Sequence, residues 1–216
     1  MLEAVARRKA NWLFNAGSEK TFNGKRRPQE DMVTSAVFGS IWQMSQLDRY
    51  GSLEILLGRE AFKATGFTPE VDINVYFWPR LPGHAGWMYV EPDILLKAAD
   101  KLVIVEVKWH APLSERQLEQ QVKAVGSDKI TAVVMLGEAG VQDKICGVRA
   151  FRRTWRDVAA ELQKANGPRR WQATMLAFLQ ETDMGRVFAG LSVMDDPRGA
   201  SFQFSKPGHR PWLDRA

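Results

Sequence analysis

Two short apolar runs joined by a charged turn constrain most strongly what this chain can fold into. They lie in the stretch "VEPDILLKAADKLVIVEVKW", residues 90–109, and only residues 97–100 separate them. Antiparallel strands can be joined by a tight turn, whereas a parallel crossover needs a dozen or more residues. The stretch therefore predicts an antiparallel hairpin with strands over about 87–96 and 101–109.

Three charged side chains interrupt this hairpin where a buried strand would prefer valine. Strand side chains alternate between faces, so Asp93 shares a face with Leu95, and Glu106 and Lys108 share one with Ile104. If the hairpin aligns these faces, the three charged groups converge. Two neighbouring carboxylates repel each other unless a cation lies between them, and Mg²⁺ takes one or two carboxylates while keeping water and phosphate oxygens. The pattern predicts a metal-dependent phosphodiesterase, in which Lys108 holds a phosphate oxygen or orients the attacking water.

The flanking segments predict a sheet with helices on its faces. Residues 30–47 carry Val33, Val37 and Ile41 at helical spacing, and Glu30 falls inside this apolar stripe. Further periodic segments are a strand over 71–78, a helix over 114–126, strands over 129–136 and 146–152, and helices over 154–164 and 171–183. The fold class expected is α/β, with a mixed central sheet flanked by helices.

The chain length and composition favour one domain over residues 1–216. The 216 residues, 45% of them hydrophobic, are enough to bury one substantial core. Within this domain we expect an N-terminal helix over 2–14 and a C-terminal helical extension over 154–216, on either side of a nuclease-like core over about 28–137 that rests on the resemblance given below.

The hairpin motifs resemble those of the PD-(D/E)XK nuclease superfamily, whose restriction-endonuclease-like core has the order αβββαβ. The motifs are "EPD", which contains Asp93, and "EVK", which contains Glu106 and Lys108; the two acids are thirteen positions apart. The resemblance covers about residues 28–137. It implies a Mg²⁺- or Mn²⁺-dependent nuclease, acting on DNA more than on RNA. Asp93, Glu106 and the backbone carbonyl of Val107 would be metal ligands, and Lys108 would assist the water and the charge developing at phosphorus.

Two further positions extend this resemblance. Some members place an additional metal-binding glutamate on the first helix, where this chain has Glu30. Others carry a glutamine on the helix after the third strand, followed four residues later by tyrosine; Gln117 takes the glutamine's place and Gln121 stands in the tyrosine's. The resemblance thus implies Glu30 as a metal ligand and Gln117 as a catalytic-site residue. The simpler interpretations are a helix-end acid for Glu30 and a surface amide for Gln117.

The charge balance favours an anionic partner. The formal net charge is +5, with a pI of about 9.4, which suits nucleic acid. Lys25, Arg26 and Arg27 precede the Glu30 helix and are expected to contact phosphates on the way to the metal. No sequence-reading module such as a zinc finger occurs, so specificity would come from DNA shape, a homodimer or a partner protein.

Cysteine and hydropathy patterns suggest a reducing, cytoplasm-like compartment. The single cysteine, Cys146, excludes a disulfide within the chain and a four-thiolate zinc site. The first residues lack the apolar core of a signal peptide, and no stretch of about 18 apolar residues occurs.

Several alternatives remain open. One alternative is a non-catalytic nucleic-acid-binding or scaffolding subunit with a nuclease-like fold, and another is an enzyme that uses paired carboxylates on sugars. Glu106 and Lys108 also fit an exposed ion pair of little energetic value. Glu91, on the same strand face as Asp93, is either a substitute ligand or, as the simpler interpretation, a solvated surface acid. A role in bacterial defence or repair follows from the resemblance alone.

Overall fold

The computed structural model describes residues 21–22, 25–26, 30–83, 88–109, 114–138, 140–164, 169–181, 193–194 and 201–202. The chain divides into two compact units, Met1–Arg186 and Val187–Ala216. In the second unit the described elements are β11 (Val193–Met194) and β12 (Ser201–Phe202), which pair antiparallel. The helix expected over 2–14 lies outside the described residues, and the single-domain expectation stays a prediction.

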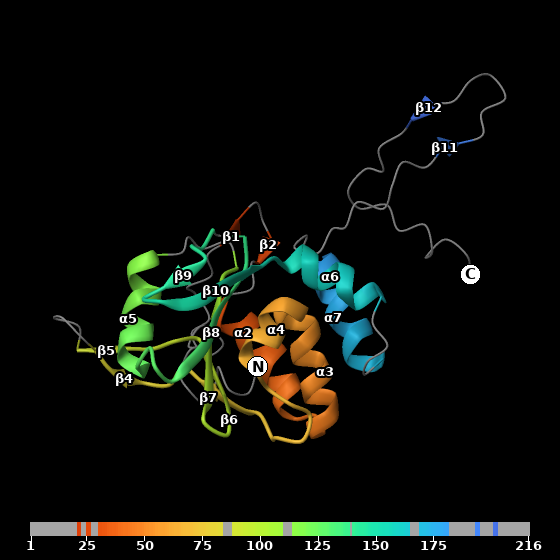
Figure 1. Ribbon diagram of the computed structural model, residues 1–216. Coiled ribbons are helices and arrows are strands. Elements are labelled where there is room, and N and C mark those ends of the chain that lie inside the picture. The colour runs from red at the N-terminus through yellow and green to blue at the C-terminus, as the bar shows by residue number, and fades with distance from the viewer. Residues whose placement is uncertain are drawn as a thin grey trace. The chain divides into compact units, whose positions relative to one another are not determined.

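A six-stranded mixed sheet forms the centre of the first unit (Figure 1). Its strand order is β3-β6-β7-β8-β10-β9, in which β7 pairs parallel with β8 and β8 parallel with β10, while the other pairs are antiparallel. The strands are β3 (Asn74–Phe77), β6 (Ile94–Ala98), β7 (Lys101–Val107), β8 (Ile130–Leu136), β9 (Lys144–Ile145) and β10 (Val148–Arg153). The expected mixed α/β sheet is confirmed.

Helices cover both faces of this sheet. They are α2 (Glu30–Trp42), α3 (Gln46–Leu57), α4 (Arg59–Thr65), α5 (Glu115–Val125), α6 (Trp155–Lys164) and α7 (Arg169–Glu181). Two small ribbons accompany the sheet: β1 (Thr21–Phe22) pairs with β2 (Lys25–Arg26), and β4 (Leu81–Pro82) pairs with β5 (Tyr89–Val90).

The central strand β7 separates two apolar cores. Val103, Val105 and Val107 are fully buried in the core that also contains residues of α2, α3, α4, α6 and α7. On the opposite face Ile104 packs in the core to which α5 contributes Leu118. Strands buried on both faces are rich in β-branched residues, and burying each such side chain contributes about 1.5–3 kcal/mol. This packing fixes β7 firmly, and its Glu106 shares the face of Ile104 that α5 covers.

The main differences from the sequence-based expectation concern the first helix and the first strand of the hairpin. The helix expected over 30–47 ends at Trp42, and α3 and α4, which were not predicted, follow it. The run 87–96 does not form one strand: Tyr89–Val90 pairs with Leu81–Pro82, and the main strand begins only at Ile94. The physical reason is Pro92, whose lack of an N–H group prevents a continuous ladder at this point.

Candidate functional site

The register of the hairpin places Asp93 opposite Glu106. Ile94 pairs with Val105 in the antiparallel ladder of β6 and β7, so the preceding residue, Asp93, faces Glu106. Directly opposed residues of an antiparallel pair project from the same face of the sheet. The backbone N–H of Val107 donates a hydrogen bond of 2.9 Å to Oδ2 of Asp93, which holds the carboxylate at the end of β7.

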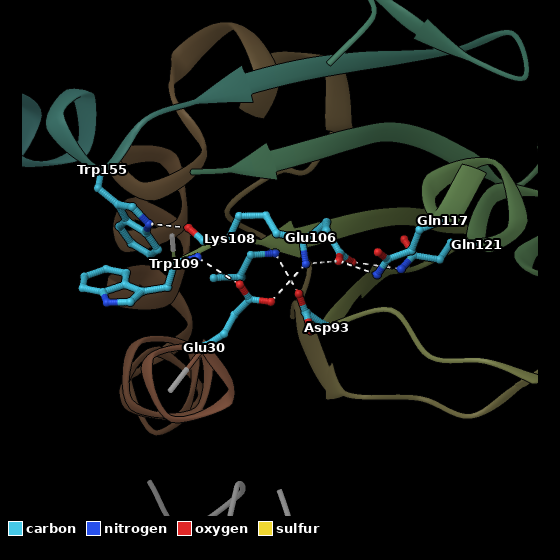
Figure 2. Close-up of polar contacts among 9 residues, drawn as sticks. Glu30, Asp93, Glu106, Lys108, Trp109, Gln117, Gln121 and Trp155 are labelled. Atoms are coloured by element: carbon cyan, nitrogen blue, oxygen red, sulfur yellow. Dashed lines mark hydrogen bonds and ion pairs between the residues drawn. The ribbon is translucent and has the colours of Figure 1, made fainter. Parts of the chain in front are cut away.

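Glu106 is the centre of the polar cluster (Figure 2). Its side chain is 1% exposed, and three side chains reach its carboxylate. The Nζ atom of Lys108 lies 2.8 Å from Oε1, to which Gln117 Nε2 also donates at 2.6 Å. Gln121 Nε2 donates to Oε2 at 2.9 Å. Bonds between a charged donor or acceptor and its partner are short and strong, so this carboxylate has a fixed orientation.

Glu30, the first residue of α2, reaches the same cluster from the other side of β7. Its Oε1 atom accepts from Lys108 Nζ at 3.0 Å, and its Oε2 atom accepts from the backbone N–H of Trp109 at 3.0 Å. Lys108 therefore lies between two carboxylates, those of Glu30 and Glu106 (Figure 2).

The backbone of Lys108 is also held from several sides. Its N–H donates to the carbonyl of Leu136 at 2.8 Å, and its carbonyl accepts from Trp155 Nε1 at 3.0 Å. Gly137 approaches so closely that a Cβ atom there would lie 2.6 Å from the Lys108 carbonyl oxygen. Such a contact requires the backbone to shift, so only glycine fits beside Lys108 in this arrangement.

Burial and charge perturb two of these groups. Burial raises the pKa of the Asp93 carboxyl well above its usual range, and the neighbouring Glu106 carboxylate raises it further, whereas the Val107 N–H and Lys108 lower it in part. Burial alone would lower the pKa of Lys108, but the carboxylates of Glu106 and Glu30 raise it above its ordinary value. Lys108 is thus protonated at neutral pH, and one ammonium faces three acidic groups.

The donor atoms of Asp93 and Glu106 suit a hard divalent cation. In the described part of the chain no group of three or more His, Cys, Asp or Glu side chains is arranged to hold a metal ion. Mg²⁺ commonly uses only one or two protein carboxylates and completes its octahedron with water and substrate oxygens. A cation between Asp93 and Glu106 would also remove the repulsion that raises the pKa of Asp93. The oxygens of this pair are of the kind that such an ion binds, and the ion would share Glu106 with the three side chains that already donate to its carboxylate.

The other residues expected at the site have different outcomes. Both Glu30 oxygens are engaged by Lys108 and Trp109, and the metal-ligand roles of Glu30 and of the Val107 carbonyl stay predictions. Lys25 and Arg26 form β2, but their side chains, and all of Arg27, lie outside the described residues. The phosphate contacts of these three basic residues are therefore untested.

Sequence reasoning assigned no role in the site to two of its contributors, Gln121 and Trp155. Gln121 lies one helical turn after Gln117, so both amides share a face of α5; this i, i+4 repeat of glutamine on an amphipathic helix was the available signal. Trp155 bonds to Lys108 across 47 positions of sequence. No local sequence pattern predicts a contact between residues so far apart in the chain.

The described helices include none that is long and apolar enough to cross a membrane. Comparisons of the chain with protein-family models, with curated proteins and with solved structures found no match.

Proposed function

We propose that this protein is a metal-dependent nuclease with a restriction-endonuclease-like core, which hydrolyses phosphodiester bonds of DNA in preference to RNA. The observation that carries the proposal is the gathering of three charged groups at the end of the hairpin. The Val107 N–H donates to Asp93, the Glu106 carboxylate acts on the Asp93 carboxyl, and the Lys108 ammonium lies 2.8 Å from Glu106. The order along the chain is α2, α3, α4, β3, β6, β7, α5, β8, with the small β4–β5 ribbon between β3 and β6. Apart from the two additional helices α3 and α4, this is the αβββαβ order, which supports the proposal.

Each side chain has a role in this proposal. Asp93 and Glu106 hold Mg²⁺ or Mn²⁺; when bound, such an ion supplies Lewis acidity and lowers the pKa of a coordinated water. Lys108, protonated because of its acidic neighbours, donates hydrogen bonds to a phosphate oxygen and stabilises the charge that develops at phosphorus. A protonated lysine cannot accept a proton, so Lys108 is not the general base.

The remaining groups position these three. Gln117 and Gln121 each donate an amide N–H to one oxygen of Glu106, which fixes the orientation of its carboxylate. Glu30 holds the Lys108 ammonium from the opposite side. Such supporting hydrogen bonds keep the charged groups in place before substrate binds, which is the condition for electrostatic catalysis.

Cleavage of plasmid, linear duplex and single-stranded DNA in Mg²⁺ or Mn²⁺ tests the proposal. We expect activity that EDTA abolishes and that falls at least about a hundredfold in Asp93→Asn and Lys108→Met, because each removes a charge at the reacting phosphate. The matched controls are Glu119→Gln and Lys123→Met, which alter an exposed ion pair on α5 and should leave the rate unchanged.

Two results would count against an enzyme of this kind. Nucleic-acid binding with no cleavage in either metal would favour a non-catalytic binding subunit. Cleavage that survives Lys108→Met and Asp93→Asn unchanged would place the chemistry elsewhere in the chain.

A further inference from the structure

The ammonium group of Lys108 is bound to the same carboxylate that the proposed metal ion needs. Its Nζ atom lies 2.8 Å from Oε1 of Glu106 and 3.0 Å from Oε1 of Glu30, and its side chain is 8% exposed. The two acids belong to different elements, since Glu30 begins α2 and Glu106 lies in β7. Figure 2 shows the lysine side chain between them. Lys108 is therefore the counter-ion of Glu106 in the structure.

A divalent ion and this ammonium compete for Glu106. Of the three side chains that donate to its carboxylate, Gln117 and Gln121 are neutral and Lys108 is a cation. The neutral amides can remain when a metal ion binds, because they carry no net charge. Two cations on one carboxylate repel each other. Water screens this repulsion little at Glu106, which is 1% exposed, so the ammonium is the donor that a metal ion displaces.

Glu30 offers the ammonium a second partner. Its Oε2 atom accepts from the backbone N–H of Trp109 at 3.0 Å, which keeps the Glu30 carboxylate in place when the contact between Lys108 and Glu106 is lost. A buried ammonium that lost every partner would be strongly destabilising, and Glu30 prevents this. An ammonium has three N–H donors, of which one is directed to Glu106 and one to Glu30. Loss of the Glu106 contact therefore releases a donor for an oxygen of a bound phosphate.

We propose that Lys108 neutralises Glu106 in the metal-free protein and is held by Glu30 instead when a divalent cation binds at Glu106. This exchange of cations rests on the proposed nuclease function and describes the regulation of its metal site. It assigns Glu30 as the residue that positions Lys108, in place of a metal ligand. In the metal-bound protein, the N–H donor that Lys108 withdraws from Glu106 is available to the substrate phosphate.

Binding of Mn²⁺ to the full-length protein without DNA tests this exchange, with free Mn²⁺ measured by electron paramagnetic resonance. Lys108→Met should bind Mn²⁺ at least about tenfold more tightly than the unaltered protein, because the competing charge is gone. Glu30→Gln should bind it about tenfold more weakly, because the ammonium then has Glu106 as its carboxylate partner. The matched controls Lys123→Met and Glu119→Gln alter an exposed ion pair on α5 and should bind Mn²⁺ within about twofold of the unaltered protein.

The double variant Lys108→Met/Glu30→Gln distinguishes a positioning role of Glu30 from a role as metal ligand. When the ammonium is absent, Glu30→Gln should change the Mn²⁺ affinity by less than about threefold, because Glu30 acts through Lys108. A direct ligand would lower the affinity by the same factor with and without Lys108, and this result overturns the exchange. Circular dichroism verifies that each variant is folded. Lys108→Gln, which keeps a hydrogen-bond donor without the charge, replaces Lys108→Met if the latter does not fold.

The exchange and the proposed nuclease fail in different ways. Mn²⁺ binding that is unchanged or weaker in Lys108→Met, or that is absent from the unaltered protein and its variants alike, overturns the exchange. Metal-dependent cleavage of DNA by the unaltered protein would then still support the nuclease. Conversely, tighter Mn²⁺ binding by Lys108→Met, with no cleavage by the unaltered protein in any metal, supports the exchange and overturns the nuclease.

Discussion

The folded protein alone does not stabilise the ionised form of the Asp93 carboxyl group. It is 8% exposed, it faces Glu106, and the cation nearest to both is Lys108, whose ammonium is shared with Glu30. A carboxyl with a pKa raised by burial and by a like charge is typical of functional sites. Replacing Asp93 and measuring stability with and without a metal ion therefore distinguishes a structural role of this residue from a role in cation binding.

Asp93→Asn should stabilise the metal-free protein at alkaline pH. Because the pKa of Asp93 is raised in the folded state, its favourable contribution is complete below the unfolded pKa of about 3.9 and is lost as pH rises through the folded pKa. The asparagine cannot ionise, so we expect the unfolding free energy at pH 8 in EDTA to rise by about 1–2 kcal/mol. Thermal unfolding at pH 5 and pH 8 measures this, and a lower Tm of the variant at pH 8 would contradict it.

Mn²⁺ should stabilise the unaltered protein and not the Asp93→Asn variant. A ligand that binds only the folded state at a hundred times its Kd adds about 2.7 kcal/mol, which is several degrees in Tm for a chain of this size. The gain should be larger at pH 8 than at pH 5, because protons compete with the metal for the raised-pKa carboxyl of Asp93. Equal Tm gains in both proteins would place the metal elsewhere.

The end of β7 depends on the close packing of β8 against it. Gly137→Ala would bring a Cβ atom to 2.6 Å from the Lys108 carbonyl oxygen and 2.8 Å from Lys108 Cβ. The backbone must move, so we expect a loss of about 1–3 kcal/mol in unfolding free energy together with lower nuclease activity. Gly140→Ala is the control, since a Cβ there meets nothing within 4 Å. Denaturant unfolding of both variants decides whether Lys108 needs this glycine.

Helix α5 supplies the two amides that hold Glu106, and in the proposed nuclease it would contribute to catalysis through them. Gln121→Leu removes the donor to Oε2 of Glu106 and places an apolar side chain of similar size in the buried position. We expect kcat to fall about 10–100-fold, the usual effect of losing a hydrogen bond that orients a metal ligand. Gln121→Glu, which adds a third carboxyl beside Glu106, should be worse. A rate within twofold of the unaltered protein in both variants would remove Gln121 from the site.

The hairpin was predictable from sequence because the relevant rules are local. The alternation of Val103, Glu106 and Val107 assigns each side chain to a face, and the short turn leaves only an antiparallel pairing. Helices α3 and α4 were not predicted in this way, since their packing depends on contacts with distant strands. The hydrogen bond from Trp155 to Lys108 and the fit of Gly137 are likewise properties of the folded chain alone.

The charge of the whole chain and that of its site have opposite signs. The chain has 30 Lys and Arg residues against 25 Asp and Glu, yet the cluster at Glu106 places three acidic side chains around one ammonium. A polyanionic substrate is repelled by such a cluster unless a metal ion neutralises it. In the proposed nuclease, attraction of DNA would have to come from basic residues outside the site, and Lys25, Arg26 and Arg27 are the expected ones.

Salt dependence of binding measures that contribution. Each phosphate contact adds about 0.9 to the slope of log affinity against log salt concentration for duplex DNA. Replacing Lys25, Arg26 and Arg27 together by alanine should therefore reduce the slope by about 2–3, whatever the DNA sequence, if all three contact phosphates. The control replaces three lysines that are exposed in the described part of the chain: Lys97, Lys123 and Lys129. Both variants lose the same charge. An equal fall in slope would therefore show that net charge alone attracts DNA. A fall only in the variant of Lys25, Arg26 and Arg27 would show that these residues contact the phosphates.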